Sequence, residues 1–210
     1  VLNQLRANRI RDISLIEKIE IFPRENLYPI KYKHLSYSDQ IINLDDGRFI
    51  LPPLTSFHLV QALDINKNDY VLEVGSGFGT TTSIINQFTT NIDCIESSVE
   101  MSDSFKISIK ENIFKANLLK TTIENFFDNR NPNIKKYQKI LINGSLDQEP
   151  SNIISKSADD AQIVCIIDNK DFKHKIVNYV KVNGNCNRFI VDEASSSFIY
   201  KFVKKEPFVF

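Results

Sequence analysis

The sequence contains no tryptophan, only three cysteines and no excess of either charge. Cys94, Cys165 and Cys186 are far apart and form no CxxC pair, which argues against a disulfide framework or a zinc site. The chain has 26 basic and 26 acidic residues, so its formal net charge is zero. A neutral chain has no overall field that attracts nucleic acid or an acidic membrane, and we expect neither as a partner.

Long apolar runs are also missing. No run reaches the roughly 18 residues of a membrane-spanning helix, and the N-terminal segment lacks the apolar core of a secretory signal. The sequence is 42% apolar and 25% charged, which is typical of a globular protein and argues against disorder. We therefore expect a cytoplasmic protein with a packed core.

The first part of the chain is predicted to be irregular. Residues 12–21 are expected to form a helix that ends before Pro23. Residues 23–53 contain four prolines and a glycine, which predicts a loop-rich segment. A second helix is expected to begin at Pro52-Pro53, because proline is tolerated in a first helical turn. We expect one domain over residues 1–210, with a cap subdomain at 1–55 and a core at 56–210.

The remaining sequence alternates apolar strands with helices, which predicts an α/β fold with a mostly parallel, doubly wound sheet. The expected strands are 70–74, 91–96, 118–122, 139–143 and 162–167, and the expected helices are 80–88, 99–113, 125–128, 150–158 and 171–178. The segments 187–193, 197–203 and 207–210 are predicted to add antiparallel strands at one sheet edge. Such strands favour a sheet edge over a partner site, and we expect a monomer or a weak homodimer.

The most informative segment is VLEVGSGFGTT, in which Gly75, Gly77 and Gly79 follow a strand directly and open a helix. Glycine allows a ligand to approach the backbone closely, and free N–H groups at a helix start favour an anion. Glu96 ends the next strand, about 20 residues beyond the first glycine, where a carboxylate grips ribose hydroxyls. The pattern predicts a nucleoside-containing ligand at the carboxyl ends of the strands.

The spacing of the glycines distinguishes a dinucleotide from other nucleoside-containing ligands. A dinucleotide-binding turn has GxGxxG, or alanine last, but Thr80 occupies that last position here. Glu73, two residues before Gly75, would repel a pyrophosphate and suits a sulfonium or ammonium cation. The acidic residue, the GxGxG turn and the acidic end of the second strand resemble the S-adenosylmethionine site of Rossmann-like class I methyltransferases. By that resemblance, Glu73 and the turn with Ser76 adjoin the methionine part, and Glu96 binds the ribose.

A closer resemblance lies in the N-terminal segment. FPREN, Pro29, YSD and DGRFILPP resemble protein-L-isoaspartate O-methyltransferases, and KYQKILINGSLDQEP is similar to that family's fourth-strand region. The likeness is to a divergent branch associated with alphaproteobacteria. The residues that match the family pattern are Pro23, Arg24, Glu25, Tyr37, Asp39, Gly47 and Pro53. The resemblance implies S-adenosylmethionine as cofactor, S-adenosylhomocysteine as product, and isoaspartyl residues of damaged proteins or peptides as acceptor.

The chain departs from this family at residues 47–56, the acceptor loop, which is expected to hold the acceptor. Aligned on Pro53, the family's Ser or Thr position holds Leu51, so no catalytic residue is assigned. Leu51 and Pro53 are expected to contact the acceptor, and the polar residues that would serve there are Thr55, Ser56 and Asn143. The resemblance leaves Glu124 as the contact for the adenine amine.

Three functions remain open: an isoaspartyl methyltransferase, a related methyltransferase with another acceptor, and an inactive cofactor-binding protein. The acceptor carboxylate is already ionised at pH 7, so methyl transfer requires alignment and exclusion of water rather than a general base. Residues 47–56 are expected to fold over the cofactor. The three histidines have no partners at metal-ligand spacing, and no metal is expected.

Overall fold

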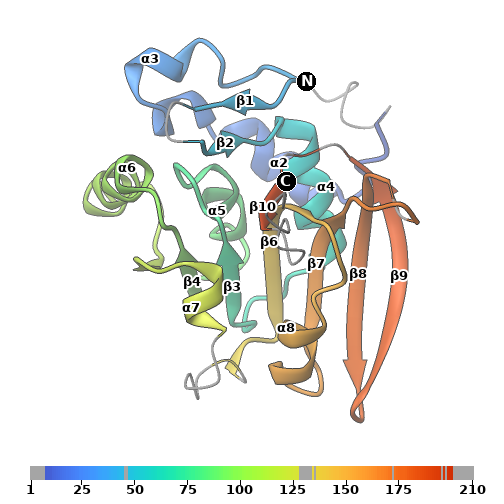
Figure 1. The fold of residues 1–210 in the computed structure, drawn as a ribbon. Coiled ribbons are helices and arrows are strands. Elements are labelled where there is room, and N and C mark those ends of the chain that lie inside the picture. Colours follow the sequence, from blue (N-terminus) through green and yellow to red (C-terminus); the bar gives the residue numbers. More distant parts are fainter. Residues whose placement is uncertain are drawn as a thin grey trace, which may run out of the picture.

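The computed structural model describes residues 8–44, 47–127, 134, 136–171, 173–194, 196 and 198–200. Its main sheet has the strand order β5-β4-β3-β6-β7-β8-β9 (Figure 1). The parallel strands are β3 (Val71–Val74), β4 (Ile92–Ile95), β5 (Asn117–Leu119), β6 (Lys139–Leu146) and β7 (Gln162–Ile167). All residues of β3 and β6 are buried, as expected for strands that are covered on both faces.

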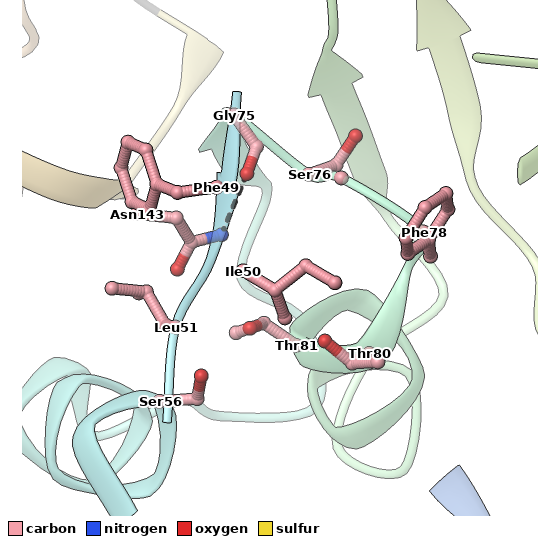
Figure 2. A pocket seen from close by; sticks show the side chains of 11 residues that line it. Phe49, Ile50, Leu51, Ser56, Gly75, Ser76, Phe78, Thr80, Thr81 and Asn143 are labelled. Atoms are coloured by element: carbon pink, nitrogen blue, oxygen red, sulfur yellow. Dashed lines mark hydrogen bonds between the residues drawn. The ribbon is translucent and has the colours of Figure 1, made fainter. Parts of the chain in front are cut away.

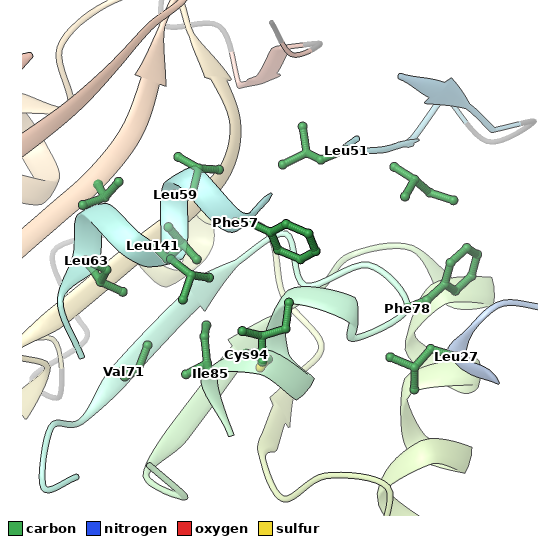
Figure 3. Packing of buried hydrophobic residues seen from close by; sticks show 14 of the residues in the cluster. Leu27, Leu51, Phe57, Leu59, Leu63, Val71, Phe78, Ile85, Cys94 and Leu141 are labelled. Carbon is green, nitrogen blue, oxygen red and sulfur yellow. The ribbon is translucent and has the colours of Figure 1, made fainter. Parts of the chain in front are cut away.

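Helices between the strands provide this cover. They are α4 (Pro53–Leu63), α5 (Thr80–Ile85), α6 (Val99–Lys110), α7 (Ile123–Phe126) and α8 (Ser151–Lys156). One apolar cluster joins α4 and α5 to the sheet through Phe57, Leu63, Ile85 and Leu141 (Figure 3). A second cluster on the opposite face includes Ile153 of α8. Two separate cores confirm the predicted doubly wound arrangement.

The N-terminal segment lies over the carboxyl ends of the parallel strands (Figure 1). Helix α2 (Ile13–Ile21) begins as predicted, with the Asp12 side chain accepting the Leu15 N–H at 3.1 Å. It is followed by the 3-10 helix η1 (Arg24–Leu27), α3 (Ile30–Lys33), and an antiparallel pair of β1 (Ile42–Asn43) and β2 (Phe49–Ile50). No helix in the described ranges is long and apolar enough to cross a membrane.

The predicted helix at 171–178 is wrong. Strand β8 (Lys175–Val182) occupies the second half of that range, and it runs antiparallel to β7 and pairs with β9 (Asn185–Glu193). Only seven residues separate β7 from β8, which is too short for the crossover that a parallel strand requires. The neighbouring prediction of an antiparallel edge strand at 187–193 is confirmed by β9.

The expected edge strand at 197–203 is also placed differently. Strand β10 (Phe198–Tyr200) pairs in parallel with the end of β6, inside the sheet. Strand β3 pairs with β6 only as far as Ile142, so the β3 side of β6 is open from there on. On its other side, β6 pairs Ser145 and Leu146 with β7, and β10 takes the open side opposite the same two residues. Residues 201–203 and 207–210 lie outside the described residues.

Two glycines offer a matched test of local packing. Gly79, before α5, has φ +88°, and an added Cβ would lie 2.7 Å from Phe114 Cε1 and 3.2 Å from Phe105 Cδ2. Gly184 has a similar φ of +77° with nothing within 4 Å. We expect Gly184→Ala to cost about 1 kcal/mol from backbone strain alone, and Gly79→Ala about 2 kcal/mol more from overlap. Urea unfolding of both variants measures the difference, and equal costs would contradict the packing of this turn.

Candidate cofactor and acceptor site

The glycine turn connects β3 to α5 at the carboxyl end of the sheet. Gly75, Gly77 and Gly79 all have positive φ, between 57° and 88°, which explains the choice of glycine. The Gly75 N–H donates to the Ile95 carbonyl at 2.8 Å, so the turn lies against the end of β4. This contact brings the turn to Glu96, the first residue after β4.

Glu96 is almost completely buried, with 1% of its surface exposed. Its Oε2 accepts the Gly77 N–H and an Arg48 Nη2 donor, each at 2.9 Å, and its Oε1 accepts the N–H groups of Ser97 and Ser98, also at 2.9 Å. The structure therefore unites the glycine turn with Glu96, as the sequence predicted. Arg48 was not predicted, because no local pattern links two residues that are 48 positions apart.

Glu73 is fully buried and belongs to a second polar cluster. Its Oε2 accepts the Thr82 hydroxyl at 2.5 Å and the Cys94 thiol at 3.6 Å, and its Oε1 accepts Asn143 Nδ2 at 2.6 Å. Burial raises the pKa of Glu73 to about 7, against the lowering effect of the hydrogen bonds from Thr82 and Asn143. Two cavities lie beside the glycine turn, and Glu73 lines neither of them. Asn143, which lines one of the two, connects it to Glu73 through a hydrogen bond.

The first cavity, of about 30 Å³, is large enough for about one water molecule. The acceptor loop, the glycine turn and Asn143 form its walls, and Asn143 lies between Gly75 and Leu51 (Figure 2). The buried Asn143 Oδ1 has no hydrogen-bond partner, whereas Asn143 Nδ2 also donates to the Gly75 carbonyl at 3.3 Å. An unpaired buried acceptor is costly and favours a ligand with a donor at this position.

The other predicted acceptor residues divide between two places. Leu51 and Ser56 line the first cavity, and the Ser56 hydroxyl donates to the Pro52 carbonyl at 3.4 Å. Thr55 instead faces a separate cavity that it shares with His58. Pro53 is buried at the start of α4 and is not among the residues that line the first cavity.

The second cavity, of about 140 Å³, lies on the other side of Gly75. Glu124, in the first turn of α7, is among the residues that line it. Its remaining walls are Arg48, Val74, Gly75, Ile95, Ser97, Thr121, Thr122, Ile123 and Ile199. The described residues include no group of three or more His, Cys, Asp or Glu placed to hold a metal ion.

The raised pKa of Glu73 makes stability depend on pH. Between pH 4.5 and about 7 the unfolded chain releases this proton while the folded protein keeps it, so stability falls as pH rises through that window. The shift corresponds to about 3 kcal/mol. We therefore expect Glu73→Gln to become progressively more stable than the original protein between pH 5 and 8, by up to about 3 kcal/mol.

Urea unfolding at four pH values in this range checks this expectation. Glu100→Gln is the matched control, because Glu100 is an exposed acid paired with Lys31. A stability difference between Glu73→Gln and the original protein that stayed constant with pH would contradict the raised pKa of Glu73.

Comparison with known proteins agrees with this geometry. The family model described as protein-L-isoaspartate(D-aspartate) O-methyltransferase matches residues 1–204. A Klebsiella pneumoniae protein named protein-L-isoaspartate O-methyltransferase is 22% identical over 211 residues, covering 98% of this chain and 95% of that protein. A Protochlamydia amoebophila protein of the same name is 27% identical over 111 residues, 53% of each chain. In the first curated relatives the match spans about half of their length.

A solved structure supports the fold. A Plasmodium falciparum protein described as a protein-L-isoaspartate O-methyltransferase, in complex with S-adenosyl-L-homocysteine, superposes with a TM-score of 0.76. The two share 15% identity, and the match covers 95% of this chain and 96% of that one. The predicted Rossmann-like methyltransferase fold is confirmed. Since the family model spans nearly the whole sequence, the chain belongs to the protein-L-isoaspartate(D-aspartate) O-methyltransferase family.

Proposed function

We propose that this protein is an S-adenosylmethionine-dependent carboxyl methyltransferase that acts on isoaspartyl residues of damaged proteins or peptides in the cytoplasm. The observation that carries the proposal is the joined glycine turn and buried Glu96, in a chain that matches the family model over residues 1–204. The Plasmodium falciparum relative in complex with S-adenosyl-L-homocysteine supports the same cofactor.

The residues on both sides of Gly75 fit the parts of this cofactor. Glu124 would accept from the adenine amine in the larger cavity, and Glu96, beside the glycine turn, would accept from the ribose hydroxyls. The unpaired Asn143 Oδ1 would accept from the methionine ammonium beside the glycine turn. When bound, the cofactor supplies an activated methyl group on a sulfonium. The ionised form of Glu73 would favour that nearby cation through Asn143.

The acceptor loop supplies little chemistry of its own. Phe49, Ile50 and Leu51 place apolar groups around the first cavity, which excludes water and keeps an acceptor carboxylate poorly solvated. Ser56, which lines the same cavity, would offer a hydroxyl to such a carboxylate. We propose that these residues align the acceptor and that no residue serves as a general base, because the carboxylate is already ionised at pH 7.

The primary test is transfer of a labelled methyl group to an isoaspartyl peptide, with the matching aspartyl peptide as control. We expect transfer to the isoaspartyl peptide only. A melting scan with S-adenosylhomocysteine at 100 times its Kd should first show stabilisation by about 2.7 kcal/mol, a rise in Tm of roughly 5–10 °C. Binding without transfer would contradict the acceptor and leave another substrate or an inactive binder, and no binding would contradict the cofactor.

A second test addresses Leu51, which is 6% exposed and lines the first cavity. Leu51→Ser would place a hydroxyl where it can donate to the acceptor carboxylate. We expect kcat/KM for the isoaspartyl peptide to rise about tenfold, mostly through a lower KM, because hydrogen bonds to charged groups contribute about 1.5–3 kcal/mol. Leu54→Ser is the matched control, because Leu54 lies outside this cavity. Unchanged kinetics for Leu51→Ser would exclude Leu51 from the acceptor site.

A further inference from the structure

The carboxylate of Glu96 has no acceptor capacity left for a ligand. A carboxylate offers about four lone-pair positions, two on each oxygen. Ser97 and Ser98 fill both positions on Oε1, while Gly77 and Arg48 fill both on Oε2. Three of these donors are backbone N–H groups, one in the glycine turn and two in the segment between β4 and α6. Arg48 is the only side chain among the four, so it is the donor that can leave when a ribose hydroxyl arrives.

The space beside Gly75 and Gly144 is also filled. A Cβ built on Gly75 would collide with Ile199 Cδ1 and would lie 3.6 Å from Arg48 Nη2. A Cβ built on Gly144 would lie 2.7 Å from Ile199 Cβ. Glycine at these two positions allows another group to come close to the backbone, and in this structure that group is the Ile199 side chain.

The position of β10 explains how Ile199 reaches this place. Strand β6 continues four residues beyond Ile142, its last partner in β3, and β10 pairs with that free side at Ser145 and Leu146. The Ser145 hydroxyl also donates to the Ser196 carbonyl at 3.3 Å. Strand β10 therefore continues the line of β3 on the same side of β6. It occupies the space beyond the carboxyl end of β3, next to the glycine turn.

We propose that Arg48 and Ile199 are internal ligands of the cofactor site, which the cofactor must displace in order to bind. The proposal rests on the proposed function, since it assumes that S-adenosylmethionine binds beside Gly75 and Glu96. Arg48 directly precedes β2, and Leu51 directly follows it, so release of Arg48 from Glu96 also frees the segment that leads to Leu51. Cofactor binding is thereby coupled to the acceptor loop, and the two residues determine the apparent affinity.

Calorimetry with S-adenosylhomocysteine tests the two residues separately. We expect Arg48→Ala and Ile199→Ala each to lower the Kd about tenfold, as for a site that is open about one-tenth of the time. The controls are Arg188→Ala, which removes a surface pair with Glu149, and Ile190→Ala on the exposed face of β9. Both controls should keep the original Kd. A Kd that is unchanged or higher in Arg48→Ala and Ile199→Ala would overturn the proposal.

Hydrogen exchange on the unaltered protein gives a second readout that does not depend on any variant folding. Ligand binding ordinarily slows exchange, but displacement of β10 should speed exchange in a peptide spanning residues 198–200 while the glycine turn becomes protected. Unchanged or slower exchange in β10 at saturating S-adenosylhomocysteine would overturn the proposal and leave the proposed function intact. Absence of binding in the original protein and in all variants would overturn both.

Discussion

The structure depends on two carboxylates buried at the ends of neighbouring parallel strands. Glu73 and Glu96 are 0% and 1% exposed, and a buried charge without partners destabilises a fold by several kcal/mol. Each is satisfied differently. Glu96 receives four donors and remains in contact with a cation, whereas Glu73 receives three uncharged donors and has a pKa raised to about 7. The donors are Thr82, Cys94 and Asn143 for Glu73, and Gly77, Ser97, Ser98 and Arg48 for Glu96.

This requirement connects parts of the chain that are distant in sequence. Arg48 ties the segment before β2 to the end of β4, and Asn143 ties β6 to β3. Strand β3 has four residues and β6 has eight, so β6 extends past the turn and leaves one side open for β10. The unequal strand lengths thus create both the space for a ligand and the position that Ile199 occupies.

The sequence predicted the features that depend on local chemistry. The strand–turn–helix order around the glycines appears in the residues themselves, and the position of Glu96 follows from the regular length of one βα unit. Strand β8 was missed because its residues were interpreted as one more crossover helix, and only the short connection after β7 reveals the antiparallel return. Strand β10 and Arg48 depend on contacts between distant residues, which no periodicity in a single sequence records.

The two buried charges also explain why a methyltransferase site would carry internal ligands. The cofactor would bring hydroxyl donors to Glu96 and a cation near Glu73. It would therefore replace Arg48 as a donor at Glu96 and add a charged partner near Glu73. If the cofactor and Arg48 were both absent, Glu96 would keep three backbone donors but no charged partner. Its position is one from which water is nearly excluded. Arg48 supplies that charge at 2.9 Å from a side chain that is 20% exposed, and in our proposal it is the donor that leaves. Exchange of one donor for another costs far less than exposure of the carboxylate, so the site can open without destabilising the sheet beneath it.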